Sequence, residues 1–187
     1  MEVGDQVVPE PQADGPMQAT SVRGLPRSIG EARALVDAAP GDVLALLDLA
    51  TLLERDGQTE AAARVIGSII DLFPSRADMR RMAGQRLDAL GDAAADLALD
   101  SYEVALEQRP DHPSSHRQVA LALVRQARYA EAFDVLEASL QRAYPGNRFA
   151  GVDRVMRDDI GLVAAAWVAQ DPSVRADVQR RQERRPK

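Results

Sequence analysis

The two histidines of the chain, His112 and His116, lie four positions apart, and His112 directly follows Asp111. Imidazole and carboxylate groups at short spacing are typical metal ligands, so a divalent cation is the first chemistry to consider. Pro113, however, suits the first position of a helix, which places His112 in the preceding turn and His116 on the first helical turn. No third ligand follows from the local pattern. We therefore interpret these histidines as a turn residue and a packing residue, and we predict no metal site.

The other side chains that suggest catalysis are explained more simply by structure. Asp158 and Asp159 are adjacent, and neighbouring residues of a helix point to different sides, so they do not form a facing pair for acid–base chemistry. Met79 and Met82 are interpreted as groove or core fillers and not as part of a cofactor site. The chain has no cysteine, which excludes disulfides, thiolate metal sites and cysteine nucleophiles. Because glycine-rich phosphate loops and nucleophile elbows are also missing, we predict no catalytic residue, no cofactor and no enzymatic activity.

The elements that carry these residues are indicated by a regular series of prolines. Four prolines lie at intervals of 34, 36 and 35 residues: Pro40, Pro74, Pro110 and Pro145. A period of this length is typical of helical repeat arrays. In the first full unit, residues 43–74, apolar residues recur at helical spacing up to Glu54, and a second helix runs to Phe73. Gly57 between them supplies the left-handed conformation that ends a helix, and proline prevents its continuation.

Three consecutive units resemble the tetratricopeptide repeat (TPR), a helix–turn–helix of about 34 residues. The matching positions alternate small and bulky residues: Leu49, Ala50, Leu53, Gly57, Ala62, Ile66 and Pro74; then Ala83, Gly84, Leu87, Gly91, Ala98, Tyr102, Ala105 and Pro110; then Val119, Ala120, Leu123, Ala127, Ala132, Leu136 and Ser139, with Pro145 one place late. The second unit has two extra residues in its turn. The early aromatic residue of the family pattern is replaced by Leu46, Arg80 and His116, so the units are divergent.

Packing explains why small residues recur in these units. We expect the two helices of each unit to approach most closely at Ala50, Gly84 and Ala120, where a larger side chain would push them apart. The sequence therefore predicts an all-α fold, a right-handed array of three TPR-like helical hairpins with an N-terminal helix and a C-terminal capping helix.

The flanking segments are predicted to cover the ends of this array. Ser28 and Glu31 have the spacing of a capping box, which begins a lone helix over residues 28–40. Ser75 and Asp78 have the same spacing at the start of the second unit. After Pro145, one longer helix is expected, with an apolar stripe on one face that would cover the third hairpin: Val152, Met156, Ile160, Val163 and Trp167.

Domain boundaries follow from composition. Residues 1–27 are rich in proline and glycine and are predicted to be a disordered tail, residues 28–172 to be the repeat domain, and residues 173–187 to be a basic helix or tail. The net charges of these three segments are −2, −8 and +4. An acidic body disfavours nucleic acid. No signal peptide or membrane-spanning stretch is recognisable, so a cytoplasmic location is the default and no membrane partner is expected.

The TPR resemblance implies that the first helices of the units line a groove for a protein or peptide segment. The family's groove positions correspond to Leu47, Thr51 and Glu54, then Arg81, Gln85 and Asp88, then Arg117, Leu121 and Val124. The lysines and asparagines with which some family members clamp chaperone C-termini are absent here. Arg81 and Arg117 occupy equivalent places in successive units, which suggests an acidic partner. The alternative is that they form surface ion pairs with Asp78 or Asp88.

Two functions are therefore open: an interaction scaffold, and a structural spacer that is a fragment of a larger bacterial protein. The spacer hypothesis comes from the segment after the third unit, "RFAGVDRVMRDDIGLVAAAW", which is similar to a helical segment of bacterial proteins with von Willebrand A-like and inter-alpha-trypsin-inhibitor-like domains. That resemblance would allow an envelope location. The partner's identity and the oligomeric state do not follow from the sequence.

Overall fold

The structure is a computed structural model that describes residues 24–142, 144 and 151–183. These residues form α-helices and short 3-10 turns, and no strand occurs among them. The elements are α1 (Ile29–Ala38), α2 (Val43–Arg55), α3 (Thr59–Leu72), α4 (Ala77–Ala89), η1 (Asp92–Ala94), α5 (Ala95–Gln108), α6 (Pro113–Arg125), α7 (Tyr129–Leu140), α8 (Val152–Gln170), η3 (Pro172–Val174) and α9 (Arg175–Glu183).

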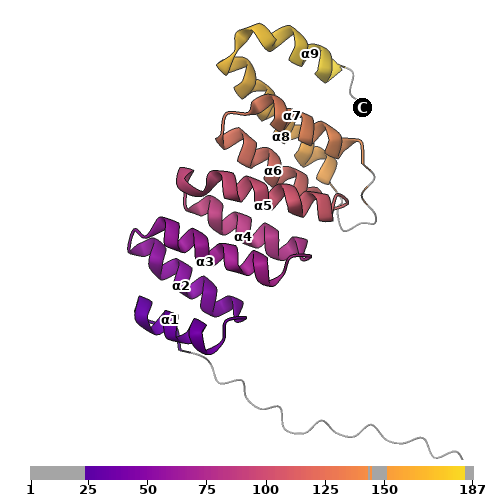
Figure 1. Cartoon of the computed structure of the whole chain (residues 1–187). Helices are drawn as coiled ribbons and strands as arrows, with labels where there is room; N and C mark the ends of the chain where they lie inside the picture. The colour runs from indigo at the N-terminus through magenta and orange to yellow at the C-terminus, as the bar shows by residue number, and fades with distance from the viewer. Residues whose placement is uncertain (1–23, 143, 145–150, 184–187) are drawn as a thin grey trace, which may run out of the picture.

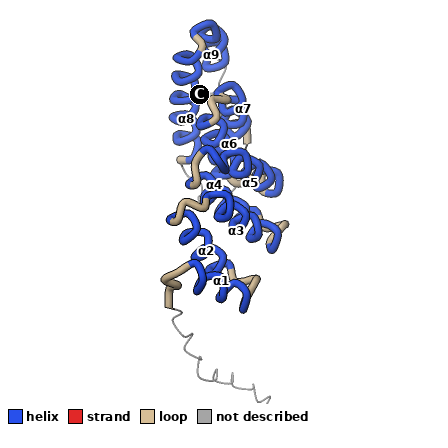
Figure 2. Tube along the Cα trace, turned by 60° about the vertical axis from the view of Figure 1, so that its left-hand side comes forward, coloured by secondary structure: helices blue, strands red, loops and turns tan. Residues whose placement is uncertain are grey.

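The helices stack in chain order, with α1 at one end and α9 at the other (Figure 1). Three hairpins, α2–α3, α4–α5 and α6–α7, form the body, and each packs against the next. In Figure 2, α2, α4, α6 and α8 lie toward one side of the stack and α3, α5 and α7 toward the other. We call the first of these groups the first-helix layer. The predicted array of three hairpins between an N-terminal helix and a C-terminal capping helix is confirmed.

The small residues predicted at the closest helix approaches are buried. Ala50 and Ala120 are 0% and 1% exposed. Gly84 is the tightest of these positions, because a Cβ atom added there would lie 2.6 Å from Cε1 of Tyr102 on α5. The separation of α4 and α5 therefore depends on the absence of a side chain at this position.

The turns inside the hairpins use a residue with positive φ at equivalent places. Gly57 and Gly91 have φ angles of 75° and 79°, and Ala127 has a φ of 57°. Glycine adopts this region freely, whereas alanine is strained there by contact between its Cβ and the backbone. The two extra residues of the second unit are taken up by η1, which follows Gly91.

Helix starts agree with the sequence at one of the two predicted capping boxes. The Ser28 hydroxyl accepts a hydrogen bond from the Glu31 backbone N–H at 3.2 Å and caps α1 as predicted. The box at Ser75 and Asp78 is wrong. Helix α4 begins two residues after Ser75, with Arg76 as N-cap, and the Asp78 carboxylate binds the Arg76 guanidinium instead.

The C-terminal helices complete the stack. On α8 the predicted stripe faces inward, with Met156, Ile160 and Val163 buried. The Trp167 ring packs against Phe133 of α7, at a centroid distance of 6.0 Å. Described residues of the predicted tail form α9, in which Val178 is buried. The predictions for residues 1–23 and 184–187 lie outside the described part of the chain.

Helix α9 is held to α7 by a basic side chain. Arg181 pairs with Asp134, lies 2.7 Å from Oε2 of Glu137, and places its guanidinium carbon 4.5 Å from the centroid of the Phe133 ring. The segment is therefore not only a solvated extension, because it covers part of α7. None of the described helices combines the length and the hydrophobicity that crossing a bilayer requires.

Candidate functional site

The nine residues predicted to line a groove all lie on α2, α4 or α6, in the first-helix layer. The structure does not leave them as one open row. Neighbouring helices of this layer are joined by contacts between an arginine and a carboxylate, and several predicted groove residues are engaged in these contacts.

Between α2 and α4 the contact is made by Arg86, which the sequence analysis did not single out. Its Nη2 donates to the Thr51 hydroxyl at 2.8 Å and lies 3.6 Å from Oε2 of Glu54. The Thr51 hydroxyl in turn donates to the backbone carbonyl of Leu47. Two predicted groove side chains, Thr51 and Glu54, are therefore engaged by Arg86 of α4.

Between α4 and α6 the contact is made by Asp88. Its carboxylate pairs with Arg125 and accepts a hydrogen bond from the Tyr102 hydroxyl at 3.2 Å. Burial raises the pKa of Tyr102, and the neighbouring Asp88 charge raises it further, so the phenol stays a donor. Asp88, a predicted groove residue, is thus engaged in a pair between the second and third units. Gln85, one turn earlier, is exposed.

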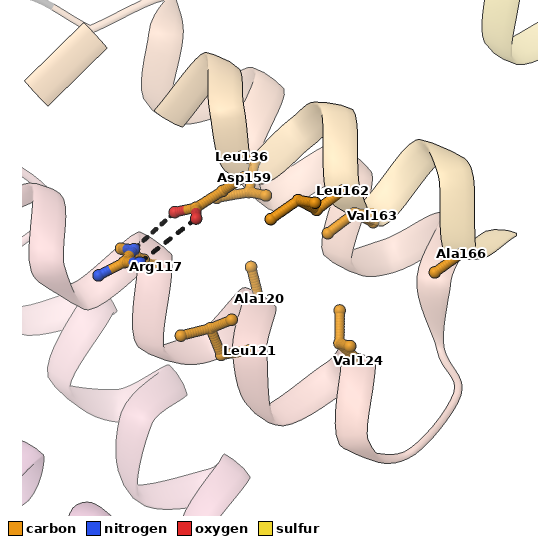
Figure 3. A pocket seen from close by; sticks show the side chains of 9 residues that line it. All are labelled: Arg117, Ala120, Leu121, Val124, Leu136, Asp159, Leu162, Val163 and Ala166. Carbon is orange, nitrogen blue, oxygen red and sulfur yellow. Dashed lines mark hydrogen bonds and ion pairs between the residues drawn. The ribbon is translucent and has the colours of Figure 1, made fainter. Parts of the chain in front are cut away.

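Between α6 and α8 the contact is made by Arg117 and Asp159. The Arg117 Nε donates to Oδ2 of Asp159 at 2.5 Å, and Nη2 donates to Oδ1 at 3.3 Å (Figure 3). This two-pronged contact raises the pKa of Arg117. The alternative that Arg117 pairs with Asp78 or Asp88 is wrong, because its acidic group comes from the capping helix.

The space beside this pair is an apolar pocket of about 290 Å³ between α6 and α8, which we call the α6–α8 pocket (Figure 3). Its lining comes from α6, α7 and α8: Arg117, Ala120, Leu121, Val124, Leu136, Asp159, Leu162, Val163 and Ala166. Leu136 closes it on the inside and is 1% exposed, whereas Leu121 and Leu162 at its margins are 38% and 71% exposed.

Leu121 and Val124 were predicted as site residues, and the structure brings them together in this pocket with Arg117. The wall formed by Leu162 and Ala166 was missed, because α8 was expected only to cover the third hairpin. No distinct signal marked this wall in the sequence. Leu162 lies outside the buried stripe of α8, and single exposed apolar residues are common on protein surfaces.

Arg81 does not share a pocket with Arg117. It lines a separate polar pocket of about 390 Å³ at the start of α4, which we call the Arg81 pocket. Its lining residues are Ser75, Arg76, Ala77, Asp78, Arg81, Gln108, Arg109 and His112. The predicted pairing of Arg81 and Arg117 along one bound segment is therefore unsupported by their positions.

The histidines take the places predicted for them. His112 is the N-cap residue of α6, and His116 is 3% exposed, with Nε2 lying 3.0 Å from the backbone oxygen of Pro110. Burial lowers the pKa of His116, so the neutral ring is favoured. Within the described ranges, no three histidine or acidic side chains gather as metal ligands would.

Comparisons with known proteins identify no family for the chain. No protein-family model matches it, and no curated protein matches it significantly. Among solved structures it is similar to MamA MSR-1 C2 (22% identity, TM-score 0.45) and to the Yersinia enterocolitica type III secretion translocator chaperone SycD (19% identity, TM-score 0.49). The first match covers 59% of this chain and 63% of the other, the second 72% and 91%.

Likenesses at this level carry no conclusion about function. The description of the hairpins as TPR-like rests on the helix pairs themselves and on their buried small residues. The chain spans less than two thirds of the first of these solved chains. The weaker resemblance to proteins with von Willebrand A-like domains receives no support from the comparisons.

Proposed function

We propose that this chain is a protein-interaction scaffold that binds a segment of a partner polypeptide at the α6–α8 pocket. One observation carries the proposal. Leu121 and Leu162, on two different helices, are both exposed and border the same apolar pocket. A monomeric surface rarely keeps large apolar side chains gathered around a hollow unless something binds there.

The size of the pocket favours a side chain over a cofactor. Small-molecule sites enclose roughly 300–1,000 Å³, and this pocket, at about 290 Å³, lies at the bottom of that range. Its single ion pair, Arg117 with Asp159, is already internally satisfied. Beyond this pair, the lining is aliphatic, so it supplies no group for catalysis. A bulky aliphatic or aromatic side chain of a partner segment fits this chemistry.

The apolar margins of the pocket supply part of the binding energy. Covering a leucine side chain contributes about 1.5–3 kcal/mol. Leu162 is mostly exposed and Leu121 partly exposed, so a docked segment would bury both while filling the pocket. The walls are preorganised, because Leu136 is already packed and the Arg117–Asp159 contact fixes α8 against α6. The side chains that line the pocket therefore lose little conformational entropy when a partner segment binds.

The polar end of the pocket adds a preference for the partner. The side chain of Arg117 is 46% exposed, so part of the guanidinium remains accessible beside Asp159. A partner segment that places a carboxylate or a backbone carbonyl there would gain a charge-assisted hydrogen bond. We therefore expect an apolar anchor residue with an acceptor group near it in the partner sequence.

Site-specific photo-crosslinking tests the proposal. A benzophenone amino acid replaces Leu162 in the full chain, expressed in cells, and the adduct is mapped by mass spectrometry. The matched control carries the same label at Leu97 of α5, which is also a large exposed residue, at 54%. We expect one partner segment to be attached from position 162 and not from position 97. Equal labelling from both positions, or none from position 162, contradicts the proposal.

A further inference from the structure

The Arg81 pocket concentrates positive charge on an acidic protein. Arg76 precedes α4, Arg81 lies on the second turn of α4, and Arg109 follows α5, yet all three line one pocket. The chain as a whole has a net charge of −6. Guanidinium groups repel one another, so three of them from separate segments form a site of high positive potential unless carboxylates neutralise each one.

Two of the three arginines have their own carboxylate. Arg76 donates from Nε and Nη2 to Asp78 at 2.8 and 2.6 Å, and Arg109 donates in the same way to Asp111 at 2.9 and 3.1 Å. The hydrogen bond from Arg76 lowers the pKa of Asp78 to about 2. Both carboxylates are therefore ionised and already engaged at neutral pH.

Arg81 differs from its two neighbours. Its Nη1 is buried and has no hydrogen-bond partner among the described residues. Burial lowers the pKa of Arg81, an effect that Asp78 opposes and the nearby Arg109 charge reinforces. Arginine nevertheless remains charged at physiological pH. A buried N–H without a partner is unfavourable, and an acceptor oxygen that reached Nη1 would remove that cost.

We propose that the Arg81 pocket binds a phosphate group carried by a polypeptide segment. A phosphate monoester has three terminal acceptor oxygens and a charge between about −1.5 and −2 at neutral pH, whereas a carboxylate has two oxygens and a single charge. Guanidiniums arranged around one pocket suit the tetrahedral group better, because Arg81 supplies an unused donor. Arg76 and Arg109 add positive charge and the Nη1 groups that take no part in their pairs with Asp78 and Asp111. Clusters of arginine are a recurring means of recognising phosphorylated segments.

The site is independent of the α6–α8 pocket. The two pockets share no lining residue, since the Arg81 pocket is built from the start of α4 and the end of α5 with the following turn. Failure of the interaction proposed at α6–α8 would leave this inference standing, and the reverse also holds.

Titration calorimetry with the full chain tests the inference. The probes are inorganic phosphate and a short glycine-rich peptide with a central phosphoserine, compared with the same peptide carrying serine or glutamate. The test variant is Arg81→Gln. The matched control is Arg80→Gln, which removes the same charge from the adjacent residue, whose Nε donates to the Pro74 carbonyl and which does not line the pocket. Thermal melts confirm that both variants fold.

We expect saturable binding of the phosphoserine peptide, at least tenfold weaker binding of the glutamate peptide, and no measurable binding of the serine peptide. Arg81→Gln should weaken binding of the phosphoserine peptide at least tenfold, and Arg80→Gln should weaken it less than twofold. Binding of inorganic phosphate without binding of the peptide would assign the pocket to a free anion and overturn the polypeptide source. If neither inorganic phosphate nor the phosphoserine peptide binds, or if the two variants weaken peptide binding equally, the site itself is overturned.

Discussion

Arg117 on α6 and Asp159 on α8 are 42 residues apart in sequence and are joined by two hydrogen bonds in the structure. This contact fixes the capping helix in the first-helix layer and forms one end of the α6–α8 pocket. It links stability to the proposed function, because loosening α8 would also open the apolar walls.

Asp159→Asn should therefore lower the free energy of unfolding by about 1–2 kcal/mol, less than for a fully buried pair because the Arg117 side chain is 46% exposed. Asp158→Asn removes the same charge from an exposed neighbouring position and should have almost no effect. Urea melts of the two variants check this. An equal effect of both substitutions would mean that the contact does not hold α8.

Gly84→Ala should destabilise the protein by about 1–3 kcal/mol, because the added methyl group would meet the ring of Tyr102 at 2.6 Å. Gly67→Ala on α3 is the matched control. Its new methyl would enter open space, so alanine's better helix propensity should stabilise the protein by about 0.5–1 kcal/mol. We expect the denaturant midpoints of the two variants to shift in opposite directions from that of the wild type. A neutral Gly84→Ala would refute the close approach of α4 and α5.

Ala127→Gly should stabilise the protein by about 0.5–1 kcal/mol, because residue 127 has a φ of 57° and glycine relieves the left-handed strain at the cost of some unfolded-state entropy. Ala165→Gly, at an exposed position inside α8, should have the opposite sign and a similar size. Calorimetric melting temperatures measure both changes. Destabilisation by Ala127→Gly would contradict the turn conformation.

Acidification should destabilise the fold partly through His116. Burial lowers the pKa of His116 in the folded chain below the usual value near 6.5, so the unfolded chain takes up the proton more readily. The resulting stability is present above the unfolded pKa and is lost as pH falls from there toward the folded pKa. Between pH 7 and pH 5.5 the decrease should be smaller in His116→Gln than in the wild type. Parallel pH dependences would show that His116 is not the group involved.

The repeating hairpins could be predicted from the sequence because the residues that indicate them act locally. Gly57 and Gly91 end helices wherever they occur in such a pattern, and the small residues Ala50 and Gly84 indicate close packing by their periodicity. The capping box at Ser75 failed for an equally local reason, because the Arg76–Asp78 pair uses the carboxylate that the cap would require.

The candidate sites were only partly predictable, because they depend on pairs of residues distant in sequence. Arg117 was singled out, but nothing in its neighbourhood indicates that Asp159 would reach it. Arg81 was also singled out, whereas its proximity to Arg109 required the return of α5 alongside α4. Arg181 looked like part of a solvated tail until its contacts with α7 were seen.

The central claim, that a partner segment occupies the α6–α8 pocket, is tested most directly by measuring the affinity of the segment crosslinked from position 162. Calorimetry with that segment compares the wild type with Leu162→Glu and with Leu97→Glu, an equal charge change on α5. Since burying one leucine contributes about 1.5–3 kcal/mol, Leu162→Glu should weaken binding roughly 10- to 100-fold, and Leu97→Glu should leave it unchanged. Equal affinities for all three proteins would contradict the account.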